Sequence, residues 1–83
     1  MSEVGHDLHA LFPDDGDILH DMKVDDAQFR ELSECYHRIE REIDRIESGL
    51  DAASDDRLEA LKRQRLDLLD SVAARVAARR RSR

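Results

Sequence analysis

Histidine and cysteine are the side chains of this 83-residue sequence with the most direct access to metal or nucleophilic chemistry. His6 and His9 lie three positions apart, so both rings would share one face of a helix, as paired metal ligands can. A metal site needs a third or fourth ligand, and His20 and His37 fall in other segments that no pattern brings together. We therefore predict polar surface histidines, no metal site and no cofactor.

Cys35 is the only cysteine, and His37 is the nearest candidate base for its thiol. Residues two positions apart on a helix do not face each other, so His37 cannot activate Cys35 there. The many carboxylates would need a concave pocket to shift their pKa values, and the isolated glycines form no phosphate-binding loop. The sequence therefore predicts that the protein is not an enzyme and has no catalytic residue. A single cysteine also makes folding independent of an oxidising compartment.

Charge is divided between the two ends of the chain, although the net charge is only −6. Residues 1–28 carry eight acidic residues and one Lys, whereas residues 71–83 carry five Arg and no acidic residue. These are Arg75, Arg79, Arg80, Arg81 and Arg83. Either they complement the negative end of a helix dipole and are solvated, or they contact phosphates or an acidic partner. An acidic head and a basic tail also suit head-to-tail attraction or two different partners. No residues suited to reading bases accompany them, so nucleic-acid contact is an alternative and not the first hypothesis.

Residues 1–24 form an acidic segment with short amphipathic turns. Leu8, Leu11 and Phe12 would share one face of a short helix, and Pro13 would end that helix. One interpretation is that Leu8, Leu11 and Phe12 form a docking peptide for a groove on a partner protein.

A second interpretation has this segment fold back on the same chain. Ile18, Leu19 and Met22 make a second amphipathic turn within it. Folded back, the turns would lie on the wide apolar face of the second long helix and cover Leu66 and Leu69. Both interpretations are open at the level of sequence.

The middle of the chain carries a heptad pattern, in which apolar residues alternate at spacings of three and four. They are Phe29, Leu32, Tyr36, Ile39, Ile43, Ile46 and Leu50. We predict a helix over residues 26–48, with Asp25 capping its first turn and Gln28 reaching back to the cap. Gly49 should end this helix by adopting a left-handed conformation.

A second long helix is predicted over residues 55–78, with Ser54 as its N-cap. Its main apolar face is formed by Leu58, Leu61, Leu68, Leu69, Val72 and Val76. Arg65 falls inside this face and needs a carboxylate, for which Glu40 or Glu42 would be near in an antiparallel pairing.

The link over residues 49–53 is too short for anything but neighbouring antiparallel helices. The sequence thus predicts an all-α fold, an antiparallel, coiled-coil-like helical hairpin over residues 25–78. A partly helical segment over residues 1–24 precedes the hairpin, and an Arg-rich tail over residues 79–83 follows it.

Several short motifs follow one another in order along residues 6–72. They include His6-Asp7-Leu8, Leu11-Phe12-Pro13, Ile18-Leu19-His20, Glu34-Cys35-Tyr36-His37, Ile43-Asp44-Arg45-Ile46 and Arg65-Leu66. In this order and spacing the chain resembles the YdcH-like family of small bacterial proteins of unknown function. The resemblance implies a mostly helical hairpin in a cytoplasmic protein, and it carries over no catalytic residue. The chain departs from the family pattern at Gly16, where a longer polar side chain is usual, and in its Arg-rich end.

The first functional hypothesis is a protein-interaction module, an oligomeric hairpin that docks on or scaffolds another bacterial protein. The second is an accessory protein that holds nucleic acid through its Arg-rich tail. Two helices bury each apolar residue on one side only, so a second copy or the chain's own N-terminal turns must cover the rest, including Leu66. We expect a homodimer. No apolar run reaches 18 residues, so no membrane insertion is predicted.

Overall fold

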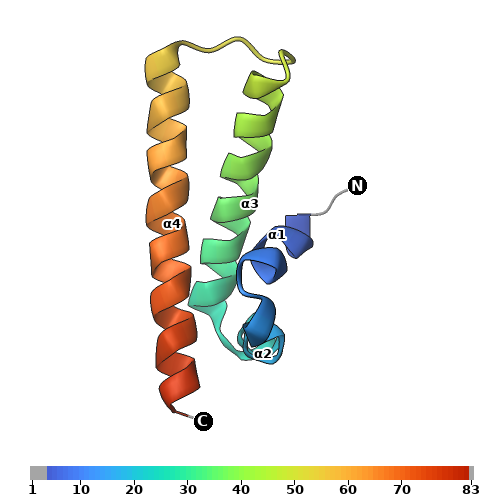
Figure 1. Ribbon diagram of the computed structural model, residues 1–83, viewed down its shortest axis with the longest axis vertical. Helices are drawn as coiled ribbons and strands as arrows, with labels where there is room; N and C mark the ends of the chain where they lie inside the picture. The colour runs from blue at the N-terminus through green and yellow to red at the C-terminus, as the bar shows by residue number, and fades with distance from the viewer. Residues whose placement is uncertain (1–3, 83) are drawn as a thin grey trace.

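The computed structural model describes residues 4–82, with side chains from Leu8 onward, and every element in this range is helical. Two long antiparallel helices, α3 and α4, stand side by side, and the shorter helices pack beside the end that lies away from their connecting loop (Figure 1). The elements are α1 (Val4–Leu11), the 3-10 helix η1 (Pro13–Asp15), α2 (Gly16–Asp25), α3 (Ala27–Glu47) and α4 (Asp55–Arg81). Residues 4–82 contain no strand, so the predicted all-α hairpin is confirmed.

Helix α3 begins one residue later than the sequence predicted, and its cap is Asp26 and not Asp25. Asp25 is the last residue of α2, and Asp26 is the residue with an extended backbone, at φ −127° and ψ 100°. The Asp26 Oδ1 atom accepts a hydrogen bond from the Phe29 N–H at 3.0 Å. Gln28 does not reach back to the cap, because its side-chain oxygen accepts a hydrogen bond from Arg75.

The loop between α3 and α4 begins with the predicted left-handed glycine. Gly49 has φ 86°, and its N–H donates to the Ile46 carbonyl at 3.1 Å, while the Leu50 N–H donates to the Arg45 carbonyl at 2.8 Å. This pair of bonds is the Schellman arrangement, which satisfies the last carbonyls of a helix. Helix α4 then starts at the predicted cap, where Ser54 Oγ accepts from the Arg57 N–H at 3.1 Å.

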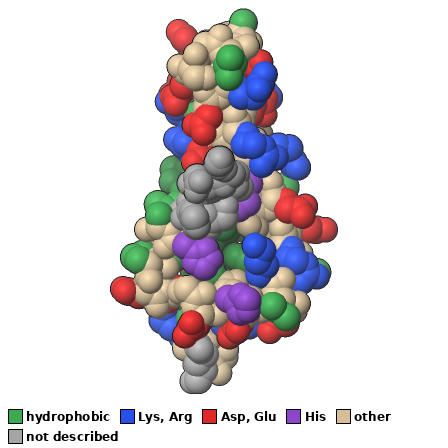
Figure 2. Space-filling model, turned by 90° about the vertical axis from the view of Figure 1, so that its right-hand side faces the viewer, with side chains coloured by type: hydrophobic (Ala, Val, Ile, Leu, Met, Phe, Trp, Pro, Cys, Tyr) green, Lys and Arg blue, Asp and Glu red, His purple; other side chains and the backbone are tan. Residues whose placement is uncertain are grey.

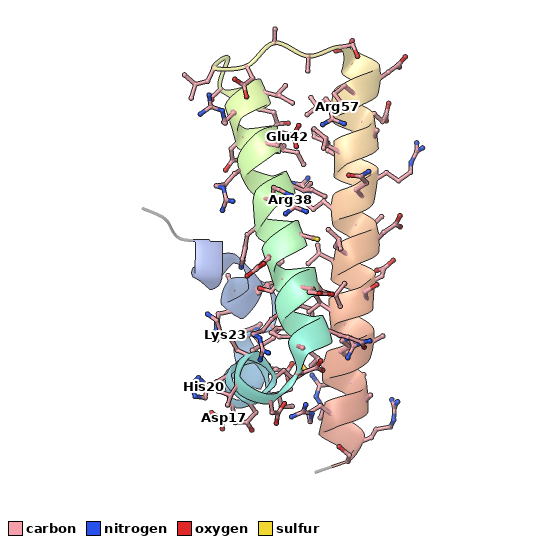
Figure 3. All side chains as sticks on the ribbon, turned by 180° about the vertical axis from the view of Figure 1, so that it is seen from behind. Asp17, His20, Lys23, Arg38, Glu42 and Arg57 are labelled. Atoms are coloured by element: carbon pink, nitrogen blue, oxygen red, sulfur yellow. The ribbon has the colours of Figure 1, made fainter. Side chains whose placement is uncertain are left out.

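Ion pairs join α3 to α4 across the hairpin. Arg65 Nη1 donates to Glu40 Oε1 at 2.6 Å, which confirms one of the two predicted partners. Glu42, the other candidate, lies closer to the loop and faces Arg57, with 2.5 Å between Oε2 and Nη2 (Figure 3).

Residues 4–25, which we call the N-terminal segment, fold back on the hairpin. Four of its apolar side chains, Leu8, Ile18, Leu19 and Met22, are buried in one cluster with Phe29, Tyr36, Val72 and Val76 of α3 and α4. The segment is more helical than the partly helical segment predicted. Figure 2 shows the resulting shape, narrow at the loop and broad where the segment packs.

The fold-back prediction was wrong about Leu66, which remains 58% exposed. The single residue Asp26 joins α2 to the start of α3, so the segment is held beside the first turns of α3. Leu69 is partly buried against the core, whereas Leu66 lies nearer the loop on α4.

Candidate interaction surfaces

Three arginines of α4 bond carboxylates at or near the N-terminal segment. Arg75 Nη1 lies 2.9 Å from Asp26 Oδ2, and Arg79 Nη2 lies 2.9 Å from Asp25 Oδ1. Arg80 donates from two nitrogens to both oxygens of Asp15, with 3.1 Å between Nε and Oδ1. We call these three pairs the arginine latch, because they join opposite ends of the sequence.

The three pairs of the latch differ in burial. Asp15 is only 6% exposed, so removing Arg80 would leave a buried carboxylate without this partner. The Arg79–Asp25 pair is at the surface, where hydrogen bonding from Arg79 lowers the pKa of Asp25 below its ordinary value of 3.8. Hydrogen bonding to Asp25 correspondingly raises the pKa of Arg79.

The arginines predicted to contact phosphates are therefore not equivalent. Arg75, Arg79 and Arg80 bond carboxylates of the same chain. Arg81, in the last turn of α4, is exposed, and Arg83 lies outside the described residues. Helix α4 continues to Arg81, three residues beyond its predicted end, which places the latch arginines on a rigid element.

The predicted docking residues are also separated by the fold. Leu8 is only 3% exposed and belongs to the core, and Phe12 packs against that core from a half-buried position. Leu11 is 51% exposed. Leu8 and Phe12 thus serve the chain's own packing, and Leu11 is the member of the trio that faces solvent.

Leu11 belongs to a groove that sequence reasoning missed. The groove has a volume of about 500 Å³ and lies between the end of α1 and the middle of α3 and α4. Its apolar lining consists of Leu11, Tyr36, Leu66 and Leu69, and its charged lining consists of Glu40, Lys62 and Arg65. We call it the Leu11–Leu66 groove. The fold-back interpretation placed the N-terminal turns over Leu66 and Leu69, but it did not predict an open groove with Leu11 on one side and Leu66 on the other.

The residues considered for metal or thiol chemistry lie apart. His9 and His20 are exposed, with His20 on the outward face of α2 (Figure 3), while the His6 side chain is outside the described part. His37 shares a 3.2 Å hydrogen bond with Ser33, and Cys35 accepts one from Arg38 at 3.3 Å. Within the described residues, no three His, Cys, Asp or Glu side chains group closely enough to hold a metal ion.

Comparison with known families gives one match. The family model described as "Protein of unknown function (DUF465)" matches residues 29–75, more than half of the chain. The chain belongs to the DUF465 family. No curated protein and no solved structure matches it.

The DUF465 match coincides with the hairpin and not with the N-terminal segment. It begins at Phe29, the first buried residue of α3, and ends at Arg75, the first arginine of the latch. The name YdcH-like stays a prediction, since the match gives the family only as one of unknown function. Across the described part of this DUF465 protein, none of the helices combines the length and apolar character that crossing a membrane requires.

Proposed function

We propose that the chain is a small protein-interaction module that binds another protein through the Leu11–Leu66 groove. The observation that carries this proposal is the exposure of Leu11 and Leu66, at 51% and 58%, on one concave surface. Large apolar side chains that gather at an exposed surface are typical of interaction sites. Neither catalysis nor a cofactor forms part of the proposal.

The charges around the groove indicate what kind of partner fits. Arg65 bonds Glu40 and Lys62 bonds Glu47, so these charges are already balanced within the chain. An occupant therefore needs no matching charge and gains most by burying apolar side chains on Leu11, Leu66 and Leu69. We take it to be an apolar cluster on another protein, bound with little dependence on salt.

The nucleic-acid alternative finds less support. Phosphate binding needs arginines that are free to approach the backbone, and it weakens steeply as salt increases. Arg75, Arg79 and Arg80 instead bond carboxylates. Asp15, Asp25 and Asp26 would have to be displaced from them first.

Site-specific photocrosslinking tests the groove in the full-length chain, in the cells that make it. A photoreactive amino acid replaces Leu66 in one variant and Gln64 in a matched control. Gln64 is exposed on a different face of α4, because residues two apart on a helix point away from each other. We expect a discrete adduct with a second protein from position 66 that position 64 does not give.

The groove also predicts that the adduct depends on α1. Adding Leu11→Glu to the position-66 variant should abolish the adduct, because it places a charge on the opposite wall. Identical adducts from positions 64 and 66, or an adduct that survives Leu11→Glu, would contradict the proposal. An adduct of twice the chain mass would show that the groove binds a second copy and not a different protein.

A further inference from the structure

One residue separates two helices that could otherwise be continuous. Helix α2 ends at Asp25, α3 begins at Ala27, and only Asp26 between them has a non-helical backbone. The helical hydrogen-bond spacing persists at this residue. The Asp26 N–H donates to the Met22 carbonyl at 2.9 Å, and the Arg30 N–H donates to the Asp26 carbonyl at 3.1 Å.

Side chains replace the backbone bonds that the bend removes. In a straight helix, the carbonyls of Lys23 and Val24 would accept from backbone N–H groups four residues later. In the bent chain both accept from Arg30 Nη1, at 3.0 and 3.2 Å. The Phe29 N–H, which would otherwise bond the Asp25 carbonyl, donates to the Asp26 side chain. The bent form thus gives other partners to three of these backbone groups, the Lys23 and Val24 carbonyls and the Phe29 N–H.

Straightening at Asp26 would carry the N-terminal segment away from its own hairpin. It would uncover an apolar surface formed by Phe29, Tyr36, Val72 and Val76, next to the latch arginines. The segment that fits this surface in shape and charge is Leu8–Asp25, and a second copy of the chain carries the same segment. Arg79–Asp25 and Arg80–Asp15 pairs could then form between copies as they do within one.

We propose that two copies exchange their N-terminal segments, with α2 and α3 joined into one helix over residues 16–47 in each. The surface is therefore an interface for a second copy of this chain, and Asp26 is the hinge. This goes beyond the proposed function, because it does not depend on what binds the Leu11–Leu66 groove. It also explains how a homodimer could form although the N-terminal segment already covers part of the hairpin.

Variants at the hinge can favour either form. Ala27→Pro should lock the bend, since proline is tolerated at the first helical position and restricts the preceding residue to an extended backbone. Asp26 is already extended, and Ala27 is exposed. Arg30→Ala should favour the straight form, because it removes both side-chain bonds to the α2 carbonyls, and Asp26→Ala should do so by removing the cap. Asp26→Asn is the matched control, since Asn caps as well as Asp but lacks the charge that faces Arg75.

Sedimentation of the full chain from micromolar to millimolar concentration measures the exchange, with circular dichroism to confirm that each variant is helical. We expect Arg30→Ala to dimerise at least about tenfold more tightly than the natural chain. Ala27→Pro should remain monomeric, as should the double variant Arg30→Ala/Ala27→Pro. Asp26→Asn, which keeps the cap, should dimerise less tightly than Asp26→Ala. Dimers that persist with Ala27→Pro, or a monomeric Arg30→Ala at every concentration, would overturn the proposal.

A charge exchange distinguishes swapping from any other association. Asp25→Arg and Arg79→Asp each place like charges together within one chain, but in a swapped heterodimer each segment meets an opposite charge on the other copy. Asp25 is exposed and Arg79 is half-buried, and neither belongs to the buried core. Native mass spectrometry of an equal mixture should show more heterodimer than random pairing gives. A random distribution would overturn the exchange.

Discussion

The two ends of the hairpin reach the same burial by different means. At the loop end, Ile43 and Leu61 are fully buried between only two helices. At the other end, Phe29, Val72 and Val76 are equally buried, but beneath a third layer, the N-terminal segment. Two antiparallel helices are therefore sufficient to bury a narrow apolar seam, and the third layer is needed only where the apolar surface is wide.

The polar contacts differ in the same way. Lys62–Glu47 and Arg57–Glu42 span the loop end, and all four side chains are substantially exposed. Exposed pairs of this kind contribute little to stability, although their aliphatic stems shield the seam. The latch includes a buried carboxylate, Asp15, whose partner is harder to replace. The loop end should therefore depend on apolar packing. The opposite end, which the N-terminal segment covers and which we call the covered end, should depend on packing and charge together.

The largest expected effect comes from the seam at the loop end. Ile43→Asp would place a charge where the side chain has no exposed surface, and it should reduce the free energy of unfolding by at least about 4 kcal/mol. Loss of the helical circular-dichroism signal at 25 °C is the expected result. Leu50→Asp, in the exposed loop, is the control and should leave the melting temperature nearly unchanged. If Ile43→Asp kept its helicity and melting temperature, the seam would not be what holds this end together.

The latch gives the next largest effect, at the covered end. Arg80→Ala leaves Asp15 buried without its two hydrogen bonds, which should cost about 1–2 kcal/mol after allowance for the exposure of Arg80 itself. In Arg80→Ala, the exchange rate of backbone amide hydrogens should increase more in α2 than around Ile43. Arg81→Ala removes the same charge from the neighbouring, exposed position, and it should have little effect. Equal changes for the two variants would mean that charge at the end of α4, and not the pairing with Asp15, is what matters.

One glycine at each end sharpens the comparison further. Gly49→Ala should reduce stability by about 1 kcal/mol, because an L residue is strained at φ 86° although nothing blocks its Cβ atom. Gly16→Ala should increase stability by about 0.5 kcal/mol, since its backbone is helical and the new Cβ meets only His9 at 3.9 Å. Urea unfolding measures both. A Gly49→Ala variant as stable as the natural chain would show that the Schellman turn does not govern the loop end.

The loop end is also the part that the sequence predicted well. Its signals are local: a heptad spacing, a glycine after the helix, and a serine cap before the next one. Once the link is known to be short, the register follows, and with it the two candidate partners of Arg65, of which the structure selects Glu40. Even the error in the α3 cap was local, because Asp25 and Asp26 are both good caps and only the end of α2 decides between them.

The covered end could be predicted only in part. The apolar turns of residues 1–24 were compatible with a fold-back and with a docking peptide. Where they lie depends on the bend at Asp26, which the sequence pattern does not reveal. Acidic and basic ends are equally compatible with solvation, so the pairs Asp15–Arg80 and Asp25–Arg79 could not be assigned. The Leu11–Leu66 groove was missed for the same reason, because its Leu11 wall depends on that docking.

Acidification gives the smallest effect, and at the end covered by the N-terminal segment it acts through Asp25. Hydrogen bonding from Arg79 lowers the pKa of Asp25 in the folded protein below its ordinary 3.8. The pair therefore contributes to stability above pH 3.8, and that contribution is lost as the pH falls from there through the lower pKa of the folded state.

Because other pairs also involve carboxylates, the informative quantity is the difference between the natural chain and Asp25→Asn. Between pH 5 and pH 3, the melting temperature of Asp25→Asn should fall less than that of the natural chain. At pH 5, the backbone amide hydrogens of α2 should already exchange faster in Asp25→Asn than in the natural chain. Asp17→Asn, on the outward face of α2 (Figure 3), controls for the loss of one negative charge. If the melting temperature of Asp25→Asn fell with pH as steeply as that of the natural chain, Arg79 would hold the N-terminal segment through something other than Asp25.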